Sequence, residues 1–156
     1  MLTLYRSDTL DSRMYTLHSA TMEDYRYCYS LCKRSMLPLF TKYWGGWKPE
    51  IFRSAFEASS TTIIRIKGRR AGWFSIRDHS THLYLNDIYI SPRYRGQGIG
   101  TSVIQNVIES SPHQTLRLTT FVDNPALNLY RRLGFQVDTV EDGVVKMSYM
   151  EESDAV

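Results

Sequence analysis

Three glycines stand at alternate positions in the segment RYRGQGIGTSVI, which covers residues 93–104. The preceding segment, HLYLNDIYI (82–90), is rich in β-branched and aromatic residues and predicts a strand, whereas the apolar residues that follow recur at helical spacing. Glycines between a strand and a helix allow several backbone N–H groups to converge, and the start of the helix adds a partial positive charge. The segment therefore predicts an anion-binding turn at Gly96, Gly98 and Gly100, with a merely flexible turn as the alternative.

The glycine spacing argues against the two common nucleotide-binding loops. Thr101 stands where the dinucleotide-binding pattern G-x-G-x-x-G requires its third glycine, and the segment lacks the Gly-Lys-Ser/Thr of a phosphate-binding NTPase loop. The ligand of this turn is therefore expected to belong to another class.

The order of the expected elements predicts one domain of the α+β class, built on a mixed sheet. A chain of 156 residues has the length of a single domain and can bury a sizeable core, which is expected over 14–150, with 1–13 and 151–156 peripheral. The expected elements are a strand over 14–20, a helix over 22–36, a second helix from 49, an antiparallel meander over 61–67, 71–78 and 82–90, a helix over 99–110, a strand over 115–121, a helix over 125–133, and a closing hairpin over 135–140 and 144–150.

Two local signals set the expected limits of the first helix. Thr21, followed three residues later by Asp24, resembles a capping box at its start. Pro38 is expected to break the helix, because proline lacks the backbone N–H of a helical hydrogen bond. This places Trp44 and Trp47, in the segment YWGGW, in a loop before the second helix.

Charge and composition exclude several functional classes and leave others open. A net charge of +3 suits an anionic small ligand as well as a nucleic acid, and the basic RIKGRR segment (65–70) lacks an aromatic stacking platform. No stretch reaches the length of about 20 apolar residues of a membrane span. Cys28 and Cys32 are neighbours on one helical face rather than a crosslink, and no Cys or His cluster completes a metal site. We expect a cytoplasmic protein without membrane, metal or nucleic-acid partners.

Two motifs carry a resemblance to a known family. The pattern R-x-x-G-x-G, from Arg95 to Gly100, follows the segment DIYISP and resembles the acyl-CoA loop of the GCN5-related N-acetyltransferases (GNAT). The segment DNPALNLYRRLGF (123–135) resembles the second signature of that family, with an Asn-Pro helix start, a tyrosine six residues after the asparagine, and Leu-Gly-Phe. The resemblance covers roughly 14–150 and implies a mixed, mostly antiparallel sheet of about six or seven strands flanked by about four helices.

The resemblance implies that acetyl-CoA binds as co-substrate. Its pyrophosphate is expected on the amides of the glycine turn, and its pantetheine arm on the backbone of the preceding strand, as a peptide-like ligand adds to an open sheet edge. The implied cofactor-binding residues are Ile88, Tyr89, Ile90, Arg95, Gly96, Gln97, Gly98, Ile99, Gly100, Thr101, Asn124 and Tyr130.

The resemblance also implies catalytic residues. Tyr130 is expected to be the general acid, because a phenol with a pKa of about 10 is protonated at neutral pH and can donate to a departing thiolate. Asn86 stands where spermidine/spermine acetyltransferases carry the glutamate of a YLED motif; an amide takes up no proton but can hold a water. Asp87 is the neighbouring carboxylate, although strand alternation points it to the opposite face unless a bulge intervenes. The base is therefore Asp87 or a water chain.

These implications lead to one functional hypothesis and two alternatives. The hypothesis is transfer of an acetyl group to a primary amine of a small molecule or peptide, by direct attack in a ternary complex. Trp44 and Trp47 are candidate walls of the acceptor pocket, with core packing as the other interpretation. The alternatives are a catalytically silent acyl-CoA sensor, suggested by Asn86, and a nucleic-acid-binding module. An exposed final hairpin leaves room for a homodimer.

Overall fold

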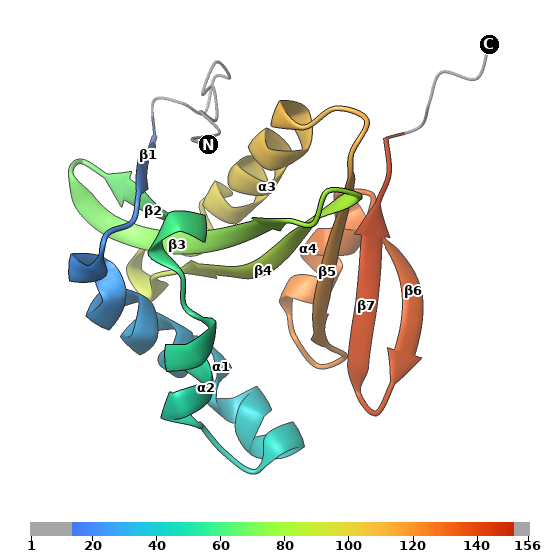
Figure 1. Ribbon diagram of the computed structural model, residues 1–156, viewed down its shortest axis with the longest axis horizontal. Coiled ribbons are helices and arrows are strands. Elements are labelled where there is room, and N and C mark those ends of the chain that lie inside the picture. Colours follow the sequence, from blue (N-terminus) through green and yellow to red (C-terminus); the bar gives the residue numbers. More distant parts are fainter. Residues whose placement is uncertain (1–13, 152–156) are drawn as a thin grey trace.

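The computed structural model describes residues 14–151, and the interpretation of 1–13 and of nearly all of 151–156 as peripheral lies outside this range. The chain folds around one seven-stranded sheet with the order β1-β2-β3-β4-β5-β7-β6 (Figure 1). Only β4 and β5 pair in parallel; every other neighbouring pair is antiparallel. The strands are β1 (Thr16–Ser19), β2 (Thr61–Ile66), β3 (Arg69–Asp78), β4 (His82–Ile90), β5 (Thr115–Phe121), β6 (Gln136–Glu141) and β7 (Val144–Tyr149).

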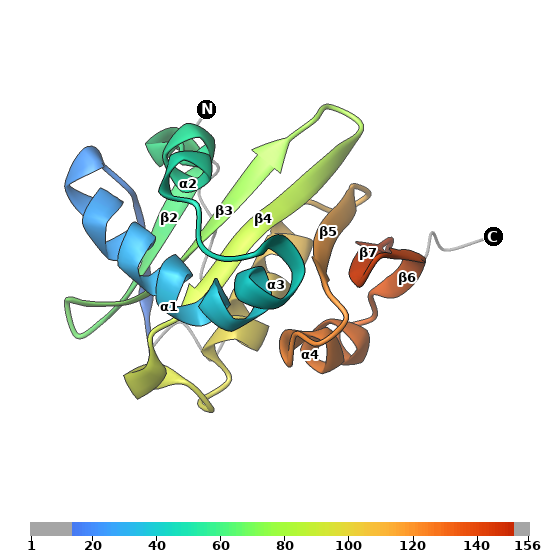
Figure 2. The same cartoon turned by 90° about the horizontal axis from the view of Figure 1, so that it is seen from below.

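Four α-helices cover the two faces of the sheet, two on each (Figure 2, in which α1 and α2 lie in front). They are α1 (Tyr25–Trp44), α2 (Pro49–Ala55), α3 (Ile99–Ser110) and α4 (Ala126–Arg132). The larger core lies between the sheet and α3 and α4, around Val103, Ile104 and Met147, and the smaller core lies under α1, around Cys28 and Trp73. None of the helices within residues 14–151 combines the length and the hydrophobicity of a membrane-spanning segment.

The expected α+β architecture is confirmed, including the β2-β3-β4 meander and the closing β6-β7 hairpin. The helix after the glycine turn begins at Ile99, as its apolar spacing predicted, and α2 begins with Pro49 at its first position. Arg69 and Arg70 belong to β3 rather than to the preceding turn.

The expected break of the first helix at Pro38 is wrong. Helix α1 continues through Pro38 to Trp44 and ends at Gly45, whose left-handed backbone donates its N–H to the Phe40 carbonyl. Proline removes one helical hydrogen bond, but Pro38 is exposed, so water can satisfy the freed carbonyl of the preceding turn. The extra turn packs its rings against Phe121 at the end of β5, and this contact offsets the missing bond.

The start of α1 is fixed by Asp24. The expected capping box is present, since the Thr21 side chain accepts the Glu23 N–H and the Asp24 carboxylate accepts the Thr21 N–H at 2.9 Å. Arg70 of β3 donates its Nε to the same carboxylate at 2.9 Å and pairs with it through a second nitrogen at 2.7 Å. One buried carboxylate therefore closes the capping box of the short 3-10 turn (Met22–Asp24) that leads into α1, and ties this turn to the sheet.

We expect Asp24→Ala to lower the free energy of unfolding by about 2 kcal/mol, the combined cost of a cap and of charged hydrogen bonds. Burial by itself raises the pKa of Asp24, but the Thr21 amide and Arg70 outweigh it and lower the pKa in the folded protein. The stabilisation is therefore complete above the ordinary carboxyl pKa of about 4 and is lost as the pH falls through the lowered value. Urea titrations at several pH values should show the difference between wild type and variant shrinking toward acid. The control is Glu23→Ala, which removes an exposed neighbour; equal losses in both variants would contradict the role of Asp24.

Candidate active site

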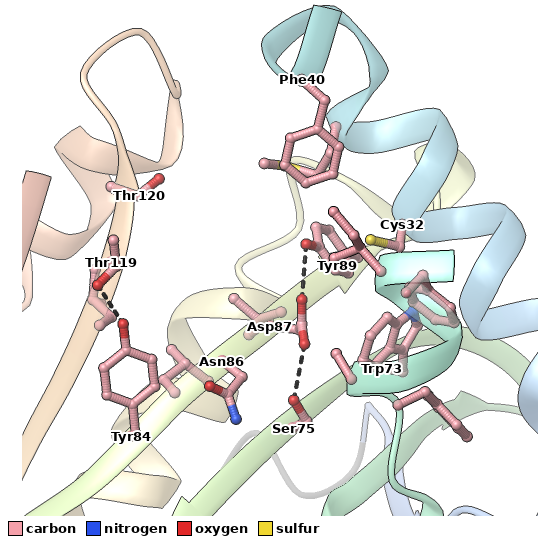
Figure 3. A pocket seen from close by; sticks show the side chains of 18 of the residues that line it. Cys32, Phe40, Trp73, Ser75, Tyr84, Asn86, Asp87, Tyr89, Thr119 and Thr120 are labelled. Atoms are coloured by element: carbon pink, nitrogen blue, oxygen red, sulfur yellow. Dashed lines mark hydrogen bonds between the residues drawn. The ribbon is translucent and has the colours of Figure 1, made fainter. Parts of the chain in front are cut away.

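A cavity of about 510 Å³ opens between the sheet and the helices α1 and α2 (Figure 3). One arm follows the gap between β4 and β5 and is lined by Ile88, Leu118, Thr120 and Tyr130. The other arm lies under α1 and α2 and is lined mainly by aromatic rings from these helices and their connecting loop. The two arms meet at β4, where the cavity is polar.

A bulge in β4 produces this polar meeting point. Ser75 pairs with Asp87 and Ile76 with Leu85, so Asn86 is an extra residue on β4. Before the bulge, Leu85 faces the core under α3. Strict alternation would point Asp87 toward the same core, but after the bulge Ile88 takes that position. The bulge that would bring Asp87 to the same face as Asn86 is therefore present, and both residues line the cavity.

The bulge also separates β4 from β5. Their parallel pairing ends at Leu85 and Leu118, although β4 continues to Ile90 and β5 to Phe121. Over the separated part, the facing edges of the two strands do not pair with each other, so an extended ligand can add to the β4 edge. This edge includes the predicted positions Ile88 to Ile90.

Asp87 is a half-buried carboxylate held by two hydroxyl groups. Ser75 donates to Oδ2 at 3.0 Å and Tyr89 donates to Oδ1 at 3.0 Å (Figure 3). Burial raises the pKa of Asp87, and the two hydroxyl groups and the charge of Arg77 lower it by less than burial raises it. Among residues 14–151, no lysine or arginine forms an ion pair with this carboxylate. Asp87 is therefore a proton acceptor with room for a cationic partner.

Asn86 and Tyr130 add hydrogen-bond donors to the same cavity as Asp87. The amide nitrogen of Asn86 is buried and finds no partner within the described chain, so it can donate to an oxygen that enters the cavity. Tyr130 of α4 is only 6% exposed. Burial, followed by the nearby charge of Asp87, raises the pKa of Tyr130 to about 12. The phenol is thus protonated at neutral pH, as its predicted role requires.

The glycine turn has the backbone of an anion site. Gly96 and Gly98 have φ angles of +74° and +79°, and an added Cβ at either position would meet no other atom within 4 Å. Ser102 donates its N–H to the Gly98 carbonyl, which leaves the amides of Ile99, Gly100 and Thr101 without a helical acceptor. Gly100 itself has an ordinary backbone, so the fold places no demand for glycine there.

Two predicted cofactor residues have structural partners. Arg95 donates to the Ile90 carbonyl at 2.8 Å and to Ser35 at 3.2 Å, so its guanidinium fastens the turn to β4 and α1. Asn124 accepts the N–H of Ala126, the first residue of α4, at 3.0 Å and also lines the cavity. Gln97 is exposed beside the turn.

Trp44 and Trp47 both line the aromatic arm. Trp44 belongs to the last turn of α1 and stacks on Phe40, with ring centroids 4.7 Å apart. Trp47 lies in the loop, donates its indole N–H to the Tyr29 hydroxyl at 2.8 Å, and packs against the smaller core. Pocket wall and core packing are therefore compatible roles for these tryptophans, because the aromatic side chains at the edge of the smaller core also line the cavity.

Sequence reasoning missed several cavity residues. The signal for Ser75 was available, since a serine inside the apolar strand segment AGWFSIRD needs a polar partner. Phe40 and Phe121 carried no comparable signal, because their meeting depends on the continuation of α1 past Pro38. Tyr84 and Thr119 join β4 to β5 by a hydrogen bond between their hydroxyl groups.

Comparisons with known proteins agree on a family. The model of the acetyltransferase (GNAT) family matches residues 15–135. Thialysine N-epsilon-acetyltransferase of Mus musculus is 40% identical over 76 residues, which are 46% of this chain and 45% of that protein. The chain thus spans less than half the length of this curated relative.

Solved structures share the fold. The ribosomal-protein-S18-alanine N-acetyltransferase from Escherichia coli matches with a TM-score of 0.68 and 20% identity, over 92% of this chain and 99% of that one. The PaiA N-acetyltransferase from Thermoplasma acidophilum, solved in complex with coenzyme A, matches with a TM-score of 0.67 and 14% identity, over 88% and 99%. At these identities the likeness shows the architecture alone.

Proposed function

The chain belongs to the acetyltransferase (GNAT) family, and from this premise we propose that it transfers an acetyl group from acetyl-CoA to a primary amine. The amine attacks directly, with both substrates bound at once. The observation that carries the proposal is the meeting of the two cavity arms at Asn86 and Asp87, beside Tyr130. An arm for each substrate, joined at a proton acceptor and two donors, is what direct transfer needs.

The described residues fit acetyl-CoA at two places. The free amides at the start of α3 and the bare Gly96 and Gly98 fit a pyrophosphate, and the unpaired edge of β4 fits an amide-containing arm. When bound, acetyl-CoA supplies an acetyl group activated as a thioester. The turn and the edge of β4 hold and orient it at the bulge.

The amine must lose protons before and after it attacks. Asp87 can bind an ammonium group and accept one proton, because its carboxylate lies in the cavity and its raised pKa makes it a stronger base than an exposed aspartate. Tyr130 supplies a proton to the departing sulfur, and Asn86 offers its buried N–H to an oxygen at the same point. The second proton of the attacking nitrogen restores the Tyr130 hydroxyl, and the proton taken by Asp87 leaves through the open side of the cavity.

An acyl-CoA sensor without turnover is the second candidate, because Asn86 stands where related enzymes carry a glutamate. The bulge weakens this alternative, since it brings another carboxylate, Asp87, into the cavity. Release of coenzyme A that depends on an added amine distinguishes the enzyme from the sensor.

Gly98→Ala tests the glycine turn. The new methyl group projects from the turn where the pyrophosphate is proposed, so we expect at least about a tenfold loss of acetyl-CoA affinity, measured by calorimetry. Gly68→Ala is the matched control, because Gly68 has a similar φ of +76° and equally open surroundings in the β2-β3 turn. Equal affinity in Gly98→Ala and the control would remove the turn from the binding site.

Tyr130→Phe tests the proton donor. We expect kcat to fall about 100-fold while acetyl-CoA affinity changes little, because phenylalanine keeps the ring packing against Phe135 and loses only the hydroxyl. Tyr149→Phe is the control, since Tyr149 also packs on Phe135 but lies outside this cavity. A kcat for Tyr130→Phe equal to that of the control would exclude Tyr130 as the acid.

Asp87→Asn tests the base through the pH dependence of kcat. A protonated carboxyl accepts no proton, so the wild-type rate should fall as the pH decreases through the raised pKa of Asp87, above the usual value of about 4. Asp87→Asn should be about 100-fold slower and lack this acidic limb, whereas Asp78→Asn, at an exposed strand end, should keep it. An unchanged limb in Asp87→Asn would assign the proton to a water chain.

A further inference from the structure

The aromatic arm of the cavity, under α1 and α2, is the proposed acceptor arm, and its wall consists of aromatic rings that hold one another in place. Phe40 stacks on Trp44. The ring centroid of Trp47 lies 5.3 Å from that of Tyr29, in an edge-on contact, and 6.0 Å from that of Phe52. Contacts of this kind, reinforced by the hydrogen bond from Trp47 to Tyr29, leave the rings little freedom. The arm is therefore a preformed surface for a flat apolar group rather than a flexible channel.

The charges in the cavity favour a ligand with a single ammonium group. Two carboxylates line it: Glu57 pairs with Arg77 at 3.5 Å, whereas Asp87 forms no ion pair with any described residue and feels Arg77 only as a nearby charge. Arg77 and Lys48 line the same cavity as cations. A second or third ammonium group would thus meet positive charge instead of a partner.

Beyond the acceptor arm, the last turn of α1 contacts the loop after β5 and the β6-β7 turn. Tyr43 stacks on Phe121 at 4.8 Å with an interplanar angle of 2°, and its hydroxyl donates to Asp123 at 2.6 Å. Lys42 also pairs with Asp123, in the loop between β5 and α4. At the β6-β7 turn, the Tyr43 ring lies so close that a Cβ on Gly143 would be only 2.3 Å from it. No room is left for a polypeptide to pass between α1 and this turn.

From these three features we infer that the acceptor is a small primary amine carried on an aromatic body, rather than a polyamine or a polypeptide. Its ring binds among Phe40, Trp44 and Trp47, and its ammonium group pairs with Asp87 at the meeting point of the arms. The inference rests on the proposed acetyl transfer and specifies its substrate class. The cavity volume of about 510 Å³, which includes the arm between β4 and β5 proposed for the acyl group, suits a molecule of this size.

The test is a comparison of five amines with the purified chain and acetyl-CoA. The amines are tryptamine, 2-phenylethylamine, hexylamine, spermidine and a short peptide with a free N-terminus; release of thiol gives the rate and mass spectrometry identifies the amide. We expect kcat/KM for both aromatic amines to exceed that for hexylamine at least tenfold, with spermidine and the peptide no better than hexylamine.

The outcomes separate the two proposals. If spermidine, the peptide or hexylamine is acetylated as well as the aromatic amines, the substrate inference is overturned and acetyl transfer stands. If none of the five amines is acetylated, the proposed function fails with it.

A variant of Trp44 tests whether the ring wall causes the preference. Trp44 is 49% exposed, so its replacement should leave the fold intact, as a thermal melt would verify. In Trp44→Leu the ratio of kcat/KM for tryptamine to that for hexylamine should fall about fivefold, and Trp44→Phe should restore most of it. Val140→Ala, on the exposed face of β6, is the control and should keep the wild-type ratio. An unchanged ratio in Trp44→Leu would overturn the assignment of the ring to this wall.

Discussion

One extra residue in β4 is the constraint on which the rest of the site depends. Because Asn86 has no opposite residue on β3, the strand reverses its alternation, and Asp87 faces the cavity together with Ser75 and Tyr89. The same bulge ends the pairing with β5 and opens a gap in the middle of a continuous sheet. A single irregularity thus positions the carboxylate and makes room for the group on which it acts.

The half-buried carboxylate of Asp87 is stabilised in a way that suits proton transfer. Two hydroxyl donors satisfy its oxygens without neutralising its charge, and burial keeps its pKa raised. A neighbouring arginine in direct contact would have lowered that pKa and removed the attraction for an ammonium group. The arrangement at Asp24 is the opposite case, since Arg70 pairs with that carboxylate and lowers its pKa, and it serves stability.

Helix α1 connects the fold to the acceptor arm. Its first half packs Cys28 and Cys32 into the smaller core, where burial raises the pKa of both thiols to about 12 and keeps them protonated. Its last turn reaches Phe121. The first half of α1 therefore fixes the helix to the sheet, and its last turn supplies part of the cavity wall.

The amino-acid sequence alone determined the features that depend on a few consecutive residues. The turn at Gly96 and Gly98, the cap at Thr21 and the helix start after Asn124 follow from local backbone chemistry, and strand and helix periods were sufficient for the α+β class. The tertiary structure alone decided on which face Asp87 lies and whether α1 survives Pro38. The first depends on the register of β4 against β3, and the second on a ring, Phe121, that belongs to a distant strand and contacts α1 only through the tertiary fold. Contacts between distant segments outweigh local preference at both positions, and a single sequence carries no direct signal of such contacts.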